Sequence, residues 1–241
     1  MKISVIVPAH NEAPNLATLI DEMGAALNGR DAEVIIVDDG STDNTGDVVA
    51  EKASAATVPV RYIRHTRPAG QSLALRTGVF AAAGEVIATI DGDGQNDPKY
   101  IPVLVDTLLG SGPEIGIVGG RRLGRKASGA KRLASGFANR LRRAMLHDDA
   151  LDSGCGLKAL RTDLFRRVPF FDGTHRFLPA LVRQEGFGIV HCDVMDRPRE
   201  HGSSHYGILD RGMRGWVDLM GVAWLRRRRR RIPRPEDIRH D

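Results

Sequence analysis

The organisation of the chain is clearest at Val86-Ile87-Ala88-Thr89-Ile90-Asp91-Gly92-Asp93-Gly94-Gln95-Asn96-Asp97-Pro98. The run from Val86 to Ile90 is typical of a buried strand, and it stops at two aspartates with one residue between them. Open α/β sheets bind ligands at the carboxyl ends of parallel strands. There, Asp91 and Asp93 can hold a hard divalent cation, which in turn can hold a diphosphate. Taken alone, the stretch fits a solvated Asp- and Gly-rich turn equally well.

Strands and helices alternate along the first hundred residues. Apolar runs at 3–8, 34–37, 60–63 and 86–90 predict four strands, and helical spacing of apolar residues follows the first three. Asn11 is expected to cap the first helix and Ser41 or Thr42 the second, while Gly70 begins the third. This alternation predicts a parallel, right-handed βαβ sheet. Polar residues gather after strands one, two and four, which predicts one site built from three loops.

Length and composition favour a single α/β catalytic unit. The chain has 241 residues, 41% of them hydrophobic, which is enough for one sizeable domain with a core. We expect a catalytic domain over residues 1–205, an amphipathic helix over 206–231 and a disordered tail over 232–241. The two cysteines suggest neither a metal site nor a disulfide scaffold, which favours a reducing compartment. No signal peptide is expected, and no apolar run is long enough to span a membrane.

Positive charge is concentrated in two places. Six consecutive arginines, 226–231, outweigh the whole net charge of +5. A second block, residues 115–147, holds nine Lys or Arg residues and no carboxylate. The rest of the chain is therefore acidic, and the two basic regions predict phosphate-bearing partners at defined places.

Five segments together resemble a known family. Pro8-Ala9-His10-Asn11-Glu12, Val37-Asp38-Asp39-Gly40-Ser41-Thr42-Asp43 and Asp91-Gly92-Asp93-Gly94-Gln95 resemble family 2 glycosyltransferases of the GT-A fold. Residues 152–158 and 197–207 resemble segments of the dolichyl-phosphate mannose synthase branch, whose acceptor is a polyprenyl phosphate. Three departures stand out: Gly92 replaces the usual Ala, the segment at Asp152 lacks two intervening residues, and His205 stands where Lys is common.

The resemblance implies roles for the residues of the donor side. Asp91 and Asp93 would bind Mg²⁺ or Mn²⁺, which would neutralise charge on the leaving diphosphate. Asp39 would read the base of a UDP- or GDP-sugar, with Pro8, His10 and Glu12 in the same pocket. Gln95 is expected near the donor phosphates or sugar, and Asp38 either joins the site or caps the next helix.

On the acceptor side, the implied nucleophile is a phosphate oxygen. Because it is already ionised near neutral pH, no general base is required, and catalysis becomes positioning and charge stabilisation. Cationic and hydroxyl side chains are needed instead, and the candidates are Arg121, Lys131, Arg132, Ser135, Arg199 and His205. In relatives with hydroxyl acceptors the residue equivalent to Asp152 would act as the base. Here Asp152 is expected to have a binding or structural role instead.

The C-terminal region predicts contact with a membrane surface. Residues 206–225 are strongly apolar along one side, and Trp216, Trp224 and the arginine run fit a helix lying in the interface with anionic lipids. A core-packing or dimer-forming helix is the alternative. We expect a peripheral enzyme on the cytoplasmic face of a membrane. Its anchor would be either this helix or a separate small membrane subunit. The sequence also allows the formation of a homo-oligomer.

The sequence leaves three alternatives to polyprenyl-phosphate glycosylation. One is transfer to another lipid or saccharide acceptor. The second, a sugar nucleotidyltransferase, would need a Gly-rich basic loop after the first strand, which residues 8–12 do not supply. The third is a nucleic-acid binder, suggested by the basic regions; few aromatic residues interleave with the basic block and no nucleic-acid-binding motif is present.

Overall fold

The computed structural model describes residues 1–123, 142, 144–146, 148–198 and 208–228, with only the backbone described for 208–214. In chain order the elements are β1 (Ile3–Ala9), α1 (Ala13–Ala26), β2 (Ala32–Asp38), α2 (Thr45–Ala55), β3 (Val60–Arg64), α3 (Gln71–Ala81), β4 (Val86–Thr89), α4 (Tyr100–Gly110), β5 (Ile115–Leu123), β6 (Lys158–Arg161), α6 (Thr162–Arg167), α7 (Thr174–Gln184), β7 (Gly188–Met195) and α8 (Ile208–Arg228).

The strands of the described chain form one seven-stranded sheet in the order β3-β2-β1-β4-β6-β5-β7. β3, β2, β1 and β4 pair in parallel, as do β5 and β7, while β6 runs antiparallel to both of its neighbours. The predicted α/β class with a mostly parallel sheet is confirmed. Because β1 lies between two parallel partners, all seven of its residues are buried, as is typical of a central strand.

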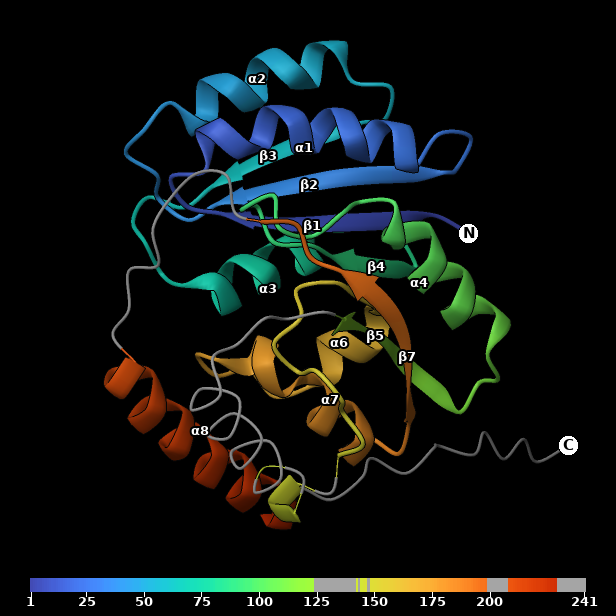
Figure 1. Ribbon diagram of the computed structural model, residues 1–241, viewed down its shortest axis with the longest axis vertical. Helices are drawn as coiled ribbons and strands as arrows, with labels where there is room; N and C mark the ends of the chain where they lie inside the picture. Colours follow the sequence, from blue (N-terminus) through green and yellow to red (C-terminus); the bar gives the residue numbers. More distant parts are fainter. Residues whose placement is uncertain (124–141, 143, 147, 199–207, 229–241) are drawn as a thin grey trace, which may run out of the picture.

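Helices cover both faces of the sheet, with α1, α2 and α4 on one side and α3, α6, α7 and α8 on the other (Figure 1). Alternation along β1 feeds both cores: Val5 and Val7 point into the first, and Ile6 points into the second. In α8, Leu219 and Val222 are buried in the second core, so one side of this helix is fixed to the body.

The predicted caps of the first two helices are wrong. α1 begins after Glu12, and α2 begins at Thr45, after Asn44. Asn11 instead adopts a left-handed φ of 55° and its Oδ1 accepts a 2.8 Å hydrogen bond from the Thr42 amide. The Ser41 hydroxyl accepts from the backbone amide of Asn11 at 2.9 Å. These polar residues join the loops after β1 and β2, a use that competes with helix capping.

Candidate active site

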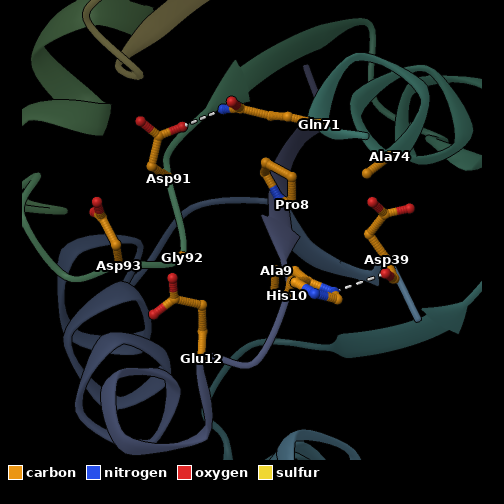
Figure 2. A pocket seen from close by; sticks show the side chains of 10 residues that line it. All are labelled: Pro8, Ala9, His10, Glu12, Asp39, Gln71, Ala74, Asp91, Gly92 and Asp93. Carbon is orange, nitrogen blue, oxygen red and sulfur yellow. Dashed lines mark hydrogen bonds between the residues drawn. The ribbon is translucent and has the colours of Figure 1, made fainter. Parts of the chain in front are cut away.

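The loops after β1, β2 and β4 meet at one edge of the sheet and line a cavity of about 280 Å³. Figure 2 shows Asp39 across this cavity from Asp91 and Asp93, with Pro8 and His10 between them. Of the seven predicted donor-side residues, the structure therefore brings together six, all except Gln95. The complete lining is Pro8, Ala9, His10, Glu12, Asp39, Gln71, Ala74, Asp91, Gly92 and Asp93.

Asp39 is held firmly by the segment before α3. Its Oδ1 accepts from the Ala69 amide and from His65 Nδ1, each at 2.8 Å, and its Oδ2 accepts from the Gly70 amide at 2.7 Å. Burial by itself would raise the pKa of Asp39, but these hydrogen bonds outweigh it and lower the pKa below its usual value. The group is thus a carboxylate with one lone-pair direction of Oδ2 still open to a ligand.

Asp38 has a structural role in the described chain. Its carboxylate is buried, accepts a 2.7 Å hydrogen bond from the Ser41 amide and is also bonded by the Tyr62 hydroxyl. These contacts close the turn after β2 and tie it to β3. Asp38 is not part of the cavity lining, so it does not join the site there. Its carboxylate has a local structural role instead, as in the second prediction, but it stabilises the turn after β2 and does not cap a helix.

Asp91 and Asp93 lie close enough to affect each other's charge. Burial, and next the neighbouring charge of Asp93, raise the pKa of Asp91 to about 6. Two carboxylates in this relation repel, and a divalent cation would relieve the repulsion, so the residues fit Mg²⁺ or Mn²⁺. Within the described ranges, no group of three or more His, Cys, Asp and Glu side chains is arranged to hold a metal ion. Phosphate and water oxygens would have to complete the coordination, as is common for Mg²⁺.

Gln71, in the first turn of α3, was missed by the sequence analysis. Its Nε2 donates a 2.7 Å hydrogen bond to Asp91 Oδ1 across the cavity wall (Figure 2). The helix beginning at Gly70 was predicted, but a glutamine at a helix start has no distinctive pattern. Only the packing of α3 against β1 and β2 places it beside the loop that follows β4.

Gly92 and Gly156 allow close approaches around Asp91. A Cβ atom on Gly156 would lie 2.5 Å from the Asp91 carboxyl, and one on Gly92 would lie 2.9 Å from the Pro8 carbonyl oxygen. The departure from Ala at residue 92 therefore has a local steric reason in this chain.

Asp152 is paired with Arg122, whose charge also acts on Asp91. Arg122 donates from Nε and Nη2 to the two carboxylate oxygens of Asp152 at 2.7 and 2.8 Å, and both side chains are mostly buried. Arg122 also lies 3.5 Å from Asp196 at the end of β7. A carboxylate held in this bidentate way is a poor proton acceptor.

The remaining predicted residues divide into two groups. Gln95 lies beside the site, where its backbone amide donates to Asp93 Oδ1 at 3.1 Å. Arg121 lies on β5 and pairs with Asp193 of β7 at 2.5 Å, with both side chains about half exposed. The other predicted acceptor-phosphate residues, Lys131, Arg132, Ser135, Arg199 and His205, lie outside the described residues.

Comparison with known proteins places the chain in context. The model of the family described as "Glycosyl transferase family 2" matches residues 4–169. A dodecaprenyl-phosphate galacturonate synthase from Rhizobium johnstonii is 33% identical over 94% of this chain and 68% of its own length. An undecaprenyl-phosphate 4-deoxy-4-formamido-L-arabinose transferase from Pectobacterium carotovorum is 32% identical over 86% of this chain and 63% of its own length. The chain thus spans about two thirds of the length of these relatives.

Solved structures share the fold. Glucosyl-3-phosphoglycerate synthase from Mycobacterium tuberculosis, in complex with Mg²⁺ and uridine diphosphate, superposes with a TM-score of 0.71 at 22% identity. The superposition covers 93% of this chain and 79% of that one. A complex of the same enzyme with Mn²⁺, UDP-glucose and phosphoglyceric acid gives a TM-score of 0.69 at 22% identity.

Proposed function

The chain belongs to glycosyl transferase family 2, and we propose that it moves one sugar from a UDP- or GDP-sugar to a polyprenyl phosphate, with inversion at the anomeric carbon. The main observation behind the proposal is that Asp39, Asp91 and Asp93 line the same cavity, although they come from two different βα loops. The two relatives are named as enzymes of polyprenyl-phosphate sugar transfer, which supports the same reaction class.

On the donor side, Asp39 would accept a hydrogen bond from a ring N–H of the base. Its lowered pKa keeps it ionised, and its hydrogen bonds to Ala69 and Gly70 hold it in one orientation. Pro8, His10 and Glu12 would line the same nucleoside pocket. His10 Nδ1–H donates to the Asp39 carbonyl at 2.8 Å, which fixes the ring against the loop after β2.

Asp91 and Asp93 would hold a divalent cation together with the donor diphosphate. When bound, Mg²⁺ or Mn²⁺ supplies positive charge for the leaving diphosphate. Glucosyl-3-phosphoglycerate synthase was solved with both of these ions, which supports metal use in this fold. The chain's own contribution is to keep the two carboxylates in place, through the side chain of Gln71 on Asp91 and through the backbone amide of Gln95 on Asp93.

The pairing of Asp152 with Arg122 favours a phosphate over a hydroxyl acceptor. A hydroxyl nucleophile needs a base, and the bidentate contact removes Asp152 from that task. A phosphate monoester arrives already ionised. We propose that the acceptor phosphate is bound by the residues predicted from the sequence, which are Arg121, Lys131, Arg132, Ser135, Arg199 and His205.

We also propose that α8 holds the enzyme at a membrane surface. The side opposite the buried Leu219 and Val222 exposes Trp216, Val217, Met220 and Trp224, and Arg226–Arg228 follow in its last turn. This stripe of apolar side chains ending in arginines suits a lipid interface with anionic headgroups. Among the helices that the structure describes, none has the length and apolar character to cross a bilayer.

A radiolabelled transfer assay tests the proposal. The full chain is incubated with Mg²⁺ or Mn²⁺, undecaprenyl phosphate and labelled UDP- and GDP-sugars, and the organic phase is counted. Label in the organic phase that requires the lipid phosphate supports the reaction. Nucleotide-sugar binding without lipid product, followed by transfer to a saccharide or small phosphate acceptor, would replace the acceptor and retain the donor site.

A further inference from the structure

A second cavity, of about 230 Å³, adjoins the nucleotide cavity and shares Gln71 and Asp91 with it. Its other lining residues come from α3, β4, the segment before β6, the first residue of β6 and the first half of α7: Leu75, Thr89, Ser153, Gly154, Cys155, Gly156, Lys158, His175, Arg176 and Leu178. If the donor diphosphate lies at Asp91, as the proposed function requires, the sugar attached to it must extend past Asp91. The second cavity adjoins Asp91 and would receive it.

This cavity is rich in positive charge. Arg176 and Lys158 line it, and Asp91 is the one carboxylate among the described lining residues. In the part of the chain that the structure describes, no carboxylate forms an ion pair with Arg176; by contrast, Arg183, two turns further along α7, is paired with Asp149 at 3.1 Å. A guanidinium stays charged at any ordinary pH and offers a planar pair of donors that matches a carboxylate.

Lys158 adds a buried amine to the same wall. The residue is only 5% exposed, and its Nζ donates to the Cys155 carbonyl. A buried ammonium needs nearby negative charge. Burial lowers the pKa of Lys158, and the charges of Cys155, Asp91 and Asp152 act in the opposite direction. Asp91 is the one carboxylate among the described lining residues, and a divalent cation bound to it would offset much of its charge. An anionic group on the ligand would supply the missing charge.

His175 contributes a hydrogen-bond donor. The Ser72 hydroxyl accepts from the backbone amides of Gly173 and His175, at 3.0 and 3.5 Å, which uses both of its lone pairs. Its proton is then directed to His175 Nδ1, which lies 2.7 Å away. Burial, with the charges of Lys158 and Arg176, lowers the pKa of His175 to about 3 and keeps the ring neutral. A neutral ring that accepts at Nδ1 carries its proton on Nε2, where it can donate to a sugar oxygen.

We propose that the second cavity binds the transferred sugar and selects a uronic acid, with Arg176 as the residue that recognises the sugar carboxylate. Lys158 balances the same charge from the buried side, and the Ser72–His175 pair donates to a ring or hydroxyl oxygen. The inference rests on the proposed function for the position of the diphosphate. A neutral hexose in this cavity would offer no counter-charge to the buried Lys158 and no carboxylate to the exposed guanidinium of Arg176.

Matched donor pairs test the proposal by binding, with no acceptor present. The pairs are UDP-galacturonate with UDP-galactose, UDP-glucuronate with UDP-glucose, and GDP-mannuronate with GDP-mannose, each differing only at C6. Isothermal titration calorimetry of the full chain with Mn²⁺ should give at least one uronate that binds about 10- to 100-fold tighter than its neutral partner, as expected for a charged hydrogen bond. Arg176→Gln should remove that difference while leaving the neutral sugar within about threefold, and Arg176→Lys should restore part of it.

The matched control is Arg183→Gln, on the same helix and outside the cavity, which should bind every donor as the parent does. Equal binding of acidic and neutral donors by the parent chain would overturn the proposal, and so would an equal loss for both in Arg176→Gln. Because binding needs no lipid, a uronate preference without lipid product would support this inference while refuting the polyprenyl acceptor. Binding of none of the six donors would refute both the inference and the donor site.

Discussion

The side-chain amide of Gln71 donates a 2.7 Å hydrogen bond to Asp91 Oδ1, and this contact forms the wall shared by the two cavities. It joins the first turn of α3 to the loop after β4, so the proposed metal ligand is oriented by an element that is distant in sequence. A ligand carboxylate with a fixed partner loses less freedom when it binds a cation.

Replacing Gln71 should therefore impair the proposed reaction more than it impairs the fold. In Gln71→Leu, we expect kcat/KM for the nucleotide-sugar to fall about 10- to 100-fold, the range of one hydrogen bond to a charged group. Steady-state kinetics over a Mn²⁺ series, with thermal unfolding of the same sample, measures both effects. An unchanged kcat/KM would show that Asp91 does not depend on Gln71.

Asp91→Asn and Asp93→Asn should each abolish metal-dependent binding of the nucleotide. Either change removes one of two anionic ligands and with it most of the attraction for Mg²⁺ or Mn²⁺. Titration calorimetry of UDP and GDP with and without Mn²⁺ is the measurement. Asp106→Asn is the control, since Asp106 lies on α4 in an exposed pair with Arg30. Metal-dependent binding that persists in Asp93→Asn would remove Asp93 from the site.

The anchored carboxylate of Asp39 predicts a pH-dependent contribution to stability. Its pKa is lowered in the folded state, so the contribution is complete above about pH 4, the unfolded value, and is lost as pH falls through the folded pKa. Asp39→Asn should cost about 1–3 kcal/mol of unfolding free energy at pH 7, because the Ala69 and Gly70 amides lose a charged acceptor. Urea unfolding from pH 7 to pH 3 should show the gap between variant and parent narrowing. Asp21→Asn, at an exposed pair with Lys52, should follow the parent throughout, and a constant gap for Asp39→Asn would contradict the assignment.

The exposed side of α8 predicts a fluorescence change on vesicles. The chain has two tryptophans, and Trp216 and Trp224 are 50% and 61% exposed on that side. Vesicles containing anionic lipid should therefore shift the emission to shorter wavelength, and neutral vesicles should do so more weakly.

Val217→Ser with Met220→Ser should weaken vesicle binding by removing apolar area from the same side of α8. Val103→Ser is the matched control, because Val103 is also about half exposed but lies on α4, against the opposite face of the sheet. Co-sedimentation with vesicles measures binding. Equal retention of the double variant and the control would exclude this face as the contact.

The local pattern of residues was sufficient for much of the fold. Apolar runs ending at Pro8, Asp38 and Asp91 marked three strands whose side chains are buried on both faces, and the polar residues after them do line one cavity. Such features can be read locally, because a buried parallel strand must be apolar throughout and a loop at its carboxyl end need not be. The same reading misplaced the starts of α1 and α2, where Asn11 and Ser41 bond to each other's loop.

The contacts that set the chemistry lie between segments far apart in the chain. Asp39 meets Gly70, Asp91 meets Gln71, Arg122 meets Asp152, and Lys158 comes beside Asp91 only because β6 pairs antiparallel to β4. The chain order alone specified which strands end in carboxylates. Which amide, arginine or amine neutralises each of them depends on packing across the sheet, because hydrogen bonds and charge pairs form between neighbours in space and not in sequence.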